Sequence, residues 1–257
     1  MSLPSTTLAE LAARLDDAAR TATAVAQISE TTALDLDDAY RVQALSIARR
    51  LERGDVRVGM KMGFTSRAKM KQMNVHSMIW GRLTRAMIAE EGGAVARARF
   101  VHPRVEPEVA FLLKRRLAGR VTAAEALAAV DAVAPALEII DSRYRDFRFS
   151  LPDVVADNSS SSAFVVGAPR PPRDASNLGL VLSIDGAPVE IGSTAAILGA
   201  PLRSLVAAAA MVAEAGESLE PGSVVMAGGA TAARPLAPGM SVELEMQELG
   251  RVCFEVE

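Results

Sequence analysis

The sequence is poor in several residue types, and each shortage excludes a class of protein. Its single cysteine, Cys253, excludes an internal disulfide framework and fits a reducing cytoplasm. Two histidines, His76 and His102, are too few for a histidine-based metal cluster. The net charge of −3 comes with no basic block, so we expect no nucleic-acid partner. We find no signal peptide and no apolar run of membrane-spanning length, and therefore expect a cytoplasmic protein with no membrane partner.

The composition is otherwise that of a globular protein. Half of the 257 residues are hydrophobic and 23% are charged. Aromatic residues make up only 4%, so alanine, valine, leucine and methionine must fill the core. This length allows one large domain, or a large domain with a small appendage.

Two helices are predicted in the first 55 residues. A capping-box pattern opens the first helix, and apolar residues then recur at intervals of three and four as far as Val25. A second amphipathic pattern follows and stops at Gly54. We therefore predict an N-terminal helical cap, residues 1–55, and a β-rich domain, residues 56–257.

Strand patterns dominate after residue 56, with helices between them. Alternating apolar residues predict the strands, and glycine, proline and capping residues mark the turns and the helix ends. The expected elements are strand 57–63, helix 67–73, strand 102–113, a helix that begins after Thr122 and ends before Pro135, strand 136–141, a polar loop over 154–162, hairpin 178–191, helix 201–216, strand 224–231 and hairpin 242–256. The fold class is therefore α+β, with a twisted, partly closed β-sheet core and helices packed outside it.

The stretch 102–113 carries the most informative pattern. Side chains alternate between the two faces of a strand, so Glu106 and Glu108 point the same way. Two carboxylates beside an apolar segment repel each other and resist desolvation, and a divalent cation such as Mg²⁺ removes both costs. A third acid, Glu138, lies in a later strand-like run. A solvated outer face is the alternative interpretation, and Pro107 between the acids favours an edge strand or a bulge.

Other polar residues lie where a ligand can reach them. Lys61 stands between two glycines of a strand, and an ordinary exposed strand lysine is the alternative. Arg143, Arg145 and Arg148 alternate with aromatic residues, and they form either a surface or fork-shaped contacts to a dicarboxylate. The serines of the loop 154–162 supply hydroxyl donors, and the glycines near the end of 224–231 let backbone N–H groups face a ligand.

Five ordered motifs resemble those of a known family. They are Lys61-Met-Gly-Phe-Thr-Ser66, Arg104-Val-Glu-Pro-Glu108, Leu137-Glu-Ile-Ile-Asp-Ser-Arg143, Val155-Ala-Asp-Asn-Ser-Ser160 and Gly192-Ser-Thr-Ala-Ala-Ile-Leu-Gly199. The chain resembles, over essentially its whole length, the hydratase/decarboxylase family of aromatic meta-cleavage pathways, within the fumarylacetoacetate hydrolase superfamily. The resemblance implies a fumarylacetoacetate hydrolase-like fold whose catalytic domain is 56–257. It also implies that Glu106, Glu108 and Glu138 bind Mg²⁺ or Mn²⁺, and that Lys61 lines the pocket as a catalytic residue.

The resemblance implies one of two activities. One is metal-dependent decarboxylation of 2-oxohex-3-enedioate to 2-hydroxypenta-2,4-dienoate and CO₂, in which the cation stabilises a dienolate. The other is hydration of 2-hydroxypenta-2,4-dienoate. The segments 68–75 and 226–233 resemble the decarboxylase branch, and Ile79 stands where hydratases typically have an aspartate for proton transfer. The chain departs from the family pattern at Met78, Trp80 and Ser159.

The same resemblance implies the partners. The substrate is expected to be a small 2-oxo dicarboxylic acid, with contacts from Ser160, Ser161, Ile79, Gly229 and Thr231. A complex with a 2-hydroxypenta-2,4-dienoate hydratase is also expected. A chain that only stabilises such a hydratase, without catalysis of its own, is the remaining alternative.

Overall fold

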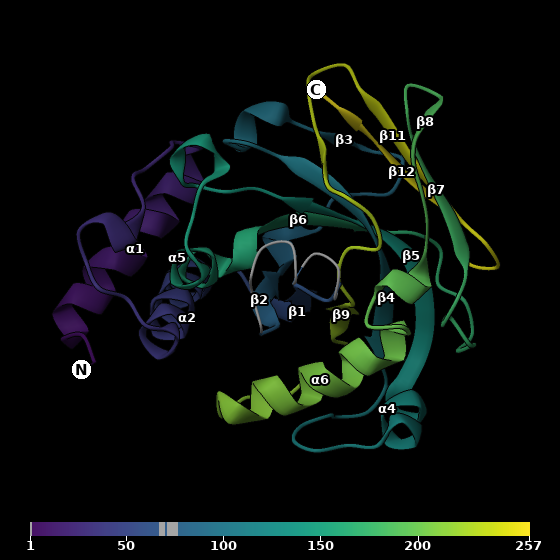
Figure 1. Ribbon diagram of the computed structural model, residues 1–257, viewed down its shortest axis with the longest axis horizontal. Helices are drawn as coiled ribbons and strands as arrows, with labels where there is room; N and C mark the ends of the chain where they lie inside the picture. The colour runs from purple at the N-terminus through teal and green to yellow at the C-terminus, as the bar shows by residue number, and fades with distance from the viewer. Residues whose placement is uncertain (1, 67–69, 71–76) are drawn as a thin grey trace.

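The computed structural model describes residues 2–66, 70 and 77–257, and its strands form two β-sheets (Figure 1). Within this part, seven strands form the first sheet in the order β2-β1-β9-β4-β5-β6, with β10 also paired to β4. Their bounds are β1 (Arg57–Gly63), β2 (Ile79–Thr84), β4 (Arg104–Leu113), β5 (Val130–Ile140), β6 (Ser161–Val166), β9 (Val224–Met226) and β10 (Arg234–Pro235). The β1–β9 pair is parallel and the other pairs of this sheet are antiparallel, so the sheet is mixed.

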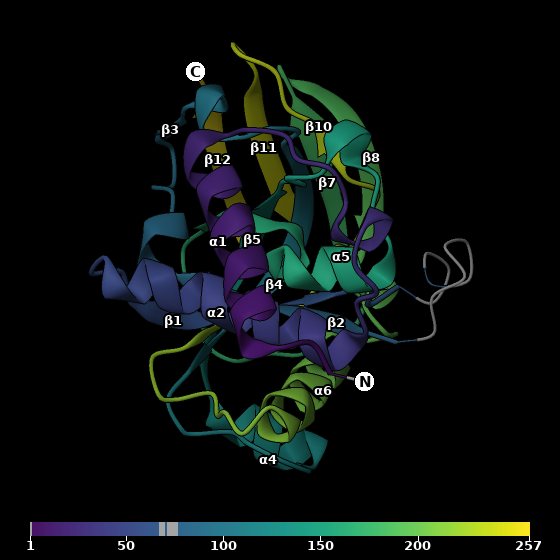
Figure 2. The same ribbon diagram turned by 90° about the vertical axis from the view of Figure 1, so that its left-hand side faces the viewer.

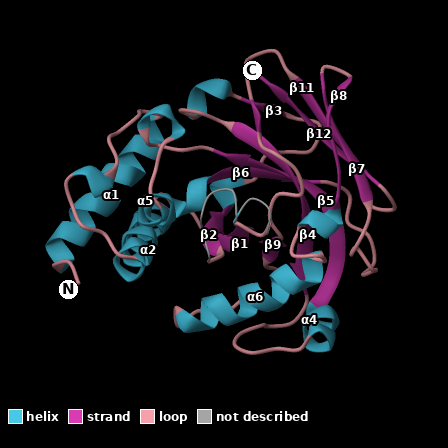
Figure 3. Cartoon of the chain, in the orientation of Figure 1, coloured by secondary structure: helices cyan, strands magenta, loops and turns pink. Residues whose placement is uncertain are grey.

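The second sheet has the order β3-β12-β11-β7-β8. Its strands are β3 (Ala94–Val95), β7 (Gly179–Ile184), β8 (Ala187–Ser193), β11 (Ser241–Met246) and β12 (Gly250–Val256). The described α-helices are α1 (Ser5–Thr21), α2 (Leu36–Glu52), α4 (Ala123–Ala129), α5 (Leu151–Ala156) and α6 (Pro201–Glu214). Figure 3 shows α1, α2 and α5 together at one side of the sheets, with α4 and α6 at another. The predicted α+β class and its curled sheet core are confirmed.

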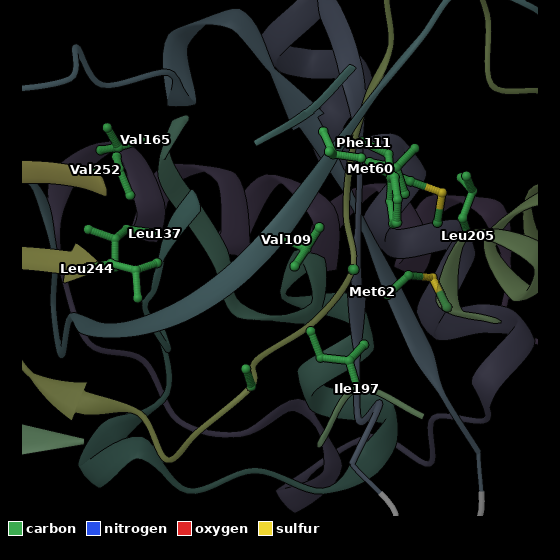
Figure 4. Close-up of a cluster of buried hydrophobic side chains, with 14 of the residues drawn as sticks. Met60, Met62, Val109, Phe111, Leu137, Val165, Ile197, Leu205, Leu244 and Val252 are labelled. Carbon is green, nitrogen blue, oxygen red and sulfur yellow. The ribbon is translucent and has the colours of Figure 1, made fainter. Parts of the chain in front are cut away.

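The main core fills the space that the first sheet shares with the second sheet and with α6. In Figure 4, Val165 lies beside Val252, and Leu137 beside Leu244, so β6 and β5 pack on the second sheet. In the same view Met60 and Phe111 lie near Leu205 of α6. All these side chains are buried, and most of them are the aliphatic residues and methionines expected to fill a core poor in aromatic residues.

Helices α1 and α2 pack against β2 and α5 through a second apolar cluster (Figure 2). Polar contacts reinforce this packing. The ring of Tyr40 stacks on Trp80, with 5.6 Å between their centroids. Gln43 is fully buried, and its side-chain amide donates to the carbonyls of Trp80 (3.1 Å) and Val155 (2.8 Å). The N-terminal helices therefore hold the strand and the short helix that flank the region described below.

Two expectations about the first sheet were wrong. Strand β4 is neither an edge nor bulged at Pro107, because it pairs with β5 on one side and with β9 and β10 on the other. The carbonyl of Pro107 accepts from Ala230 N (2.9 Å). In a strand, the N–H and the carbonyl of one residue point to the same side. On that side of Pro107 lies the irregular segment 227–233 between β9 and β10, so the N–H that proline lacks costs no strand-to-strand hydrogen bond. The strand expected at 136–141 begins at Val130 instead.

Other boundaries also differ from the prediction. Strand β9 ends at Met226, and the glycines that follow it belong to a loop. The polar loop expected over 154–162 is instead the end of α5, the turn η5 (Asn158–Ser160) and the start of β6. Strand β2 was not predicted. The helix predicted over 67–73 lies outside the described residues, apart from Met70.

One helical stretch, Thr194–Glu214, passes a length and hydropathy test for a membrane span. The turn η6 (Thr194–Ala196) is separated from α6 by Leu198 and Gly199, which have positive φ angles of 52° and 83°. The 14 residues of α6 span only about 21 Å at 1.5 Å per residue, short of the roughly 30 Å of a bilayer core. Its buried face packs into the main core, so α6 is a core helix.

Candidate active site

Three acidic side chains converge on the face of the first sheet opposite the main core. Register pairs Glu106 of β4 with Glu138 of β5, and Glu108 lies on the same face as Glu106. One carboxylate oxygen from each of the three lies within 4.8 Å of the others. Glu108 and Glu138 are fully buried and Glu106 is partly exposed. The predicted convergence of the three acids is therefore present.

The electrostatics of this cluster suit a divalent cation. Burial raises the pKa of Glu108 well above its ordinary value, and the neighbouring Glu138 carboxylate raises it further. Gly228 N donates to Glu108 Oε2 (2.6 Å), but Glu108 Oε1 and Glu138 Oε1 are buried without a hydrogen bond to the described part of the chain. Mg²⁺ and Mn²⁺ take such oxygen ligands, and their charge offsets the repulsion between carboxylates. The residues present thus fit a divalent metal ion.

Lys61 belongs to the same cluster. Its Nζ lies 3.0 Å from Glu138 Oε2, and its side chain is only 4% exposed. Burial alone would lower the pKa of Lys61, but the three carboxylates raise it by more, so its pKa lies above the ordinary value. The ammonium therefore stays charged at neutral pH. The alternative of an exposed strand lysine does not hold.

Two glycines let the loop after β9 pass close to the acids. A side-chain carbon at Gly229 would lie 2.7 Å from Glu106 Oε2. At Gly228, which has a φ of +106°, it would lie 2.0 Å from Thr65 Oγ1. The positive φ of Gly228 favours glycine there, and a side chain at Gly229 would displace the Glu106 carboxylate. The close approach brings the Gly228 N–H to Glu108.

A cavity of about 670 Å³ opens over this cluster. Five of the residues predicted from the sequence line it: Lys61, Ile79, Glu106, Ser160 and Gly229. The other four predicted site residues, Glu108, Glu138, Ser161 and Thr231, are not among its described lining residues. Ser161 is fully buried, and Thr231 lies so close to Gly192 that a side-chain carbon there would meet Thr231 Cγ2 at 2.7 Å. The substrate contacts assigned to all these residues remain predictions.

The turn that carries Ser160 has an uncommon backbone. Asn158, Ser159 and Ser160 have positive φ angles of 49°, 51° and 61°, which cost energy for residues with side chains. Bonds to β2 hold the turn, because Asn158 Oδ1 accepts from Arg82 N (2.8 Å) and Ser159 Oγ donates to the Trp80 carbonyl (2.7 Å). Such strain is typical of positions whose side chains must face a ligand.

The sequence analysis missed part of the cavity wall. Arg104 and the aromatic residues Phe64, Phe147 and Phe149 line it, and the Arg104 guanidinium lies 4.2 Å from the centre of the Phe147 ring. The alternation of arginine and aromatic residues over 143–149 was the sequence signal for this wall. The structure places the three arginines of that run in three different surroundings. Arg148 lines the cavity, Arg145 is exposed, and Arg143 is buried against Asp157 with 2.5 Å between Nε and Oδ1.

A mixed two-sheet fold with three convergent acids and a buried ammonium group beside a cavity defines the class: an enzyme site for a hard divalent cation and a small acid. Comparisons with known proteins agree. Residues 48–257 match the family model described as fumarylacetoacetate (FAA) hydrolase C-terminal. The chain belongs to the fumarylacetoacetate hydrolase family.

Individual relatives narrow this further. The chain is 59% identical over 248 residues to a 4-oxalocrotonate decarboxylase of a Pseudomonas species, covering 96% of this chain and 97% of the relative. It is 36% identical over 228 residues to a 2-keto-4-pentenoate hydratase of Paraburkholderia xenovorans, covering 87% and 85%. Among solved structures, it is similar to the 4-oxalocrotonate decarboxylase of Pseudomonas putida G7 complexed with magnesium and adipate. That match has a TM-score of 0.96 and 36% identity, over 100% of this chain and 99% of the other.

Proposed function

We propose that the protein is a metal-dependent carboxy-lyase that converts 2-oxohex-3-enedioate to 2-hydroxypenta-2,4-dienoate and CO₂. The observation that carries the proposal is the convergence of Glu106, Glu108 and Glu138 beside the charged Lys61. The higher identity to a decarboxylase than to a hydratase supports this branch of the family. Adipate, found with the related decarboxylase, is a six-carbon dicarboxylate like the proposed substrate.

The three glutamates would hold Mg²⁺, or Mn²⁺ in its place, through the carboxylate oxygens that face one another. A bound cation supplies positive charge next to the 2-oxo group, where negative charge develops as CO₂ departs. Glu108 must give up any proton before it can act as a ligand, because ligation requires the carboxylate form. The Gly228 N–H then helps to keep that carboxylate charged and oriented.

Lys61 is the residue that would act on the reacting atoms. Its ammonium lies within hydrogen-bond distance of Glu138. A substrate oxygen held near that acid can therefore also accept a hydrogen bond from Lys61. The amine either stabilises the charge on the C2 oxygen or delivers a proton after CO₂ has left. Because its pKa is raised, Lys61 carries the needed proton at neutral pH.

The cavity offers an apolar wall for the carboxylate that is lost. Ile79, Phe149 and Val154 line it, and none of them can hydrogen-bond to a carboxylate. An apolar surround destabilises a carboxylate relative to a transition state in which its negative charge moves toward the C2 oxygen, so this wall favours loss of CO₂. Ile79 is 3% exposed at the start of β2. It provides no proton shuttle of the kind that hydration of a double bond requires.

The two activities are separated by assaying the chain with Mg²⁺ on both substrates. We expect CO₂ from 2-oxohex-3-enedioate and little hydration of 2-hydroxypenta-2,4-dienoate. Ile79→Asp should lower CO₂ release by placing a charge against the departing carboxylate, while Ile79→Val, the matched control, should retain it. Hydration without CO₂ release by the unaltered chain would assign the other branch. Failure of both reactions would favour a non-catalytic partner of a hydratase.

We further propose that the chain acts in a cytoplasmic complex with a 2-hydroxypenta-2,4-dienoate hydratase. The product of decarboxylation is an unstable dienol, so a neighbouring enzyme that consumes it would prevent its loss. The single cysteine of the present chain, Cys253, is partly buried and unpaired, which is consistent with a reducing compartment. Co-elution of the two enzymes on size exclusion would support the complex, and independent elution at micromolar concentration would contradict it.

A further inference from the structure

A second cavity, of about 790 Å³, lies against the N-terminal helices. Its walls are the C-terminal ends of α1 and α2, the turns η2 (Arg85–Met87) and η3 (Arg97–Arg99), and the segment that follows β5. Figure 2 faces α1 and α2, which form one of these walls. Among described residues, this cavity and the active-site cavity share no lining residue. Its volume is in the range of sites for small molecules.

The cavity is strongly basic, although the whole chain carries a net charge of −3. Six arginines line it, which we call the arginine cavity: Arg20, Arg50, Arg53, Arg85, Arg99 and Arg143. Like charges gathered in one hollow repel each other and raise the local concentration of anions. A concentration of positive charge against the overall balance is the electrostatic signature of an anionic ligand.

The three aspartates of this cavity are already engaged by the protein. Asp141 accepts from two backbone N–H groups, at 2.9 and 2.5 Å. Asp55 likewise accepts from two backbone N–H groups, at 2.8 and 3.1 Å. Asp16 accepts hydrogen bonds from two arginines, Arg49 (3.0 Å) and Arg53 (2.7 Å). Three aspartates offset only part of the charge of the six lining arginines, so positive charge is left over.

Arg50 is the inner arginine of this cavity that is least well paired. Its side chain is 18% exposed, and its Nε lies 3.7 Å from Asp16 Oδ1, too far for a good hydrogen bond. Its guanidinium forms no hydrogen bond within the described part of the chain. Burial lowers the pKa of Arg50, and the nearby Arg143 guanidinium lowers it further. A mostly buried guanidinium is costly unless an oxyanion pairs with it.

Arg143 connects this cavity to the back of the active-site turn. Its guanidinium donates to Asp157 Oδ1 and to the Asp157 carbonyl (2.7 Å), and it also contacts the Ser162 hydroxyl. The residues between those two contacts form η5, whose Ser160 lines the other cavity. The guanidinium of Arg143 is therefore held by the protein itself. That of Arg50 forms no hydrogen bond within the described part of the chain, so its N–H groups can bind a ligand.

We propose that the arginine cavity binds a small oxyanion with two negative charges, a phosphate or a dicarboxylate, and that Arg50 is its central contact. The guanidinium presents planar paired donors that match the oxygens of either group. The site is distinct from the one that holds the substrate of the proposed reaction, so it can be occupied whether or not that reaction is correct.

Titration calorimetry on the full chain tests this, with inorganic phosphate and succinate as separate probes. At least one of them should bind saturably, and the stronger identifies the phosphate or carboxylate source. Arg50→Gln should weaken that binding about tenfold or more, since hydrogen bonds to charged groups are lost. Arg41→Gln makes the same charge change earlier on α2, outside the cavity, and should leave binding unchanged. Decarboxylation by Arg50→Gln should stay within about twofold of the unaltered chain, since both cavities are separate.

Several outcomes would overturn the proposal. No saturable binding of either probe would do so, and so would equal affinities of Arg50→Gln and the unaltered chain. Binding lost only in Lys61→Met would assign the anion to the active site. Association with an acidic protein that depends on Arg50, without small-anion binding, would make the cavity a protein interface. If Arg50→Gln does not fold, Arg85→Gln, on the exposed rim of the same cavity, should weaken binding by a smaller factor.

Discussion

At the residue scale, the pairing of Lys61 with Glu138 is an expensive arrangement for a buried position. A buried pair with its nearest atoms 3.0 Å apart is costly to desolvate, and two further carboxylates in the same hollow add repulsion. A chain selected for stability alone would place apolar side chains at these positions. The arrangement is understandable if a cation and a charged substrate complete it.

Replacing Lys61 by methionine should separate catalysis from metal binding. We expect kcat for CO₂ release to fall by about two to three orders of magnitude, the usual effect of removing one electrostatic donor. Affinity for Mn²⁺ should not weaken, because a positive charge beside the ligands is removed. Lys114→Met, at an exposed lysine, is the control and should change neither quantity. An unchanged kcat in Lys61→Met would remove this lysine from the mechanism.

The acids could be predicted from the sequence only in part. Alternation along one strand placed Glu106 and Glu108 on a common face, and this needs no tertiary information. The meeting of Glu106 with Glu138 depends on the register between β4 and β5, which spacing does not fix. Only the family resemblance implied that Glu138 joins the other two acids. Arg104 and Phe149 were missed because loops and strand ends bring them together, and local patterns do not encode that geometry.

At the scale of elements, glycine positions set how closely strands can approach. A side-chain carbon at Gly59 of β1 would lie 1.8 Å from the Val224 carbonyl oxygen of β9. That pair is the parallel contact that joins the lysine strand to the rest of the sheet. From the sequence, the space beside Gly59 was expected to admit a ligand, whereas the neighbouring backbone of β9 fills it.

Gly59→Ala should therefore destabilise the fold. We expect the free energy of unfolding to fall by about 3 kcal/mol, the upper part of the usual range for overpacking, because a backbone atom must move. Chemical denaturation measures the change. Gly179→Ala, in strand β7, is the matched control, since nothing comes within 3.7 Å of the added carbon. Equal stabilities of Gly59→Ala and the unaltered chain would contradict the packing described for β1 and β9.

Helices α1 and α2 are joined by a buried acid whose effect depends on pH. Asp16 is 1% exposed and contacts Arg49 and Arg50 of α2 and Arg53, which caps the end of that helix. Burial acts to raise the pKa of Asp16, but hydrogen bonds from Arg53 and Arg49 outweigh it, so the pKa is lowered from 3.8. A carboxylate with a lowered pKa stabilises the folded state above its unfolded pKa, and this is lost as pH falls through the folded pKa.

Asp16→Asn tests that linkage. At neutral pH we expect it to reduce the free energy of unfolding by about 1 to 2 kcal/mol, since its partners are partly exposed. The difference from the unaltered chain should shrink below about pH 4, where protonation removes the same charge. Asp17→Asn, at an exposed neighbouring acid, should have little effect. A difference that stays constant from pH 7 to pH 3 would show that the charge of Asp16 is not involved.

Element types were more predictable than element ends. The two N-terminal helices and the closing hairpin follow from strong periodicity, and the structure confirms them. The capping box predicted to open the first helix was wrong, because α1 begins at Ser5 after Pro4 and has no side-chain cap. Prolines misled the analysis in β4 and β5, because each fits a regular strand when its missing N–H faces an irregular neighbour. Strand β2 was not predicted, since every residue in it is buried and no alternation marks it.

At the scale of the whole molecule, the sheets and the helices have different structural roles. The main core and α6 make a rigid support on one face of the first sheet, and the acids occupy the opposite face. The N-terminal helices brace β2 and α5, and they also wall the arginine cavity. The fold class and the family were predicted from the sequence and are confirmed. The division at residues 55 and 56 remains a prediction.

The central claim is that one divalent cation on Glu106, Glu108 and Glu138 makes CO₂ release possible. The most direct test strips the protein with a chelator and titrates it with Mn²⁺ while bound metal and CO₂ release from 2-oxohex-3-enedioate are measured together. We predict no activity without metal and a rate that rises in proportion to bound metal, saturating at one ion per chain, with both lost in Glu106→Gln. Full CO₂ release by the metal-free protein would contradict the account.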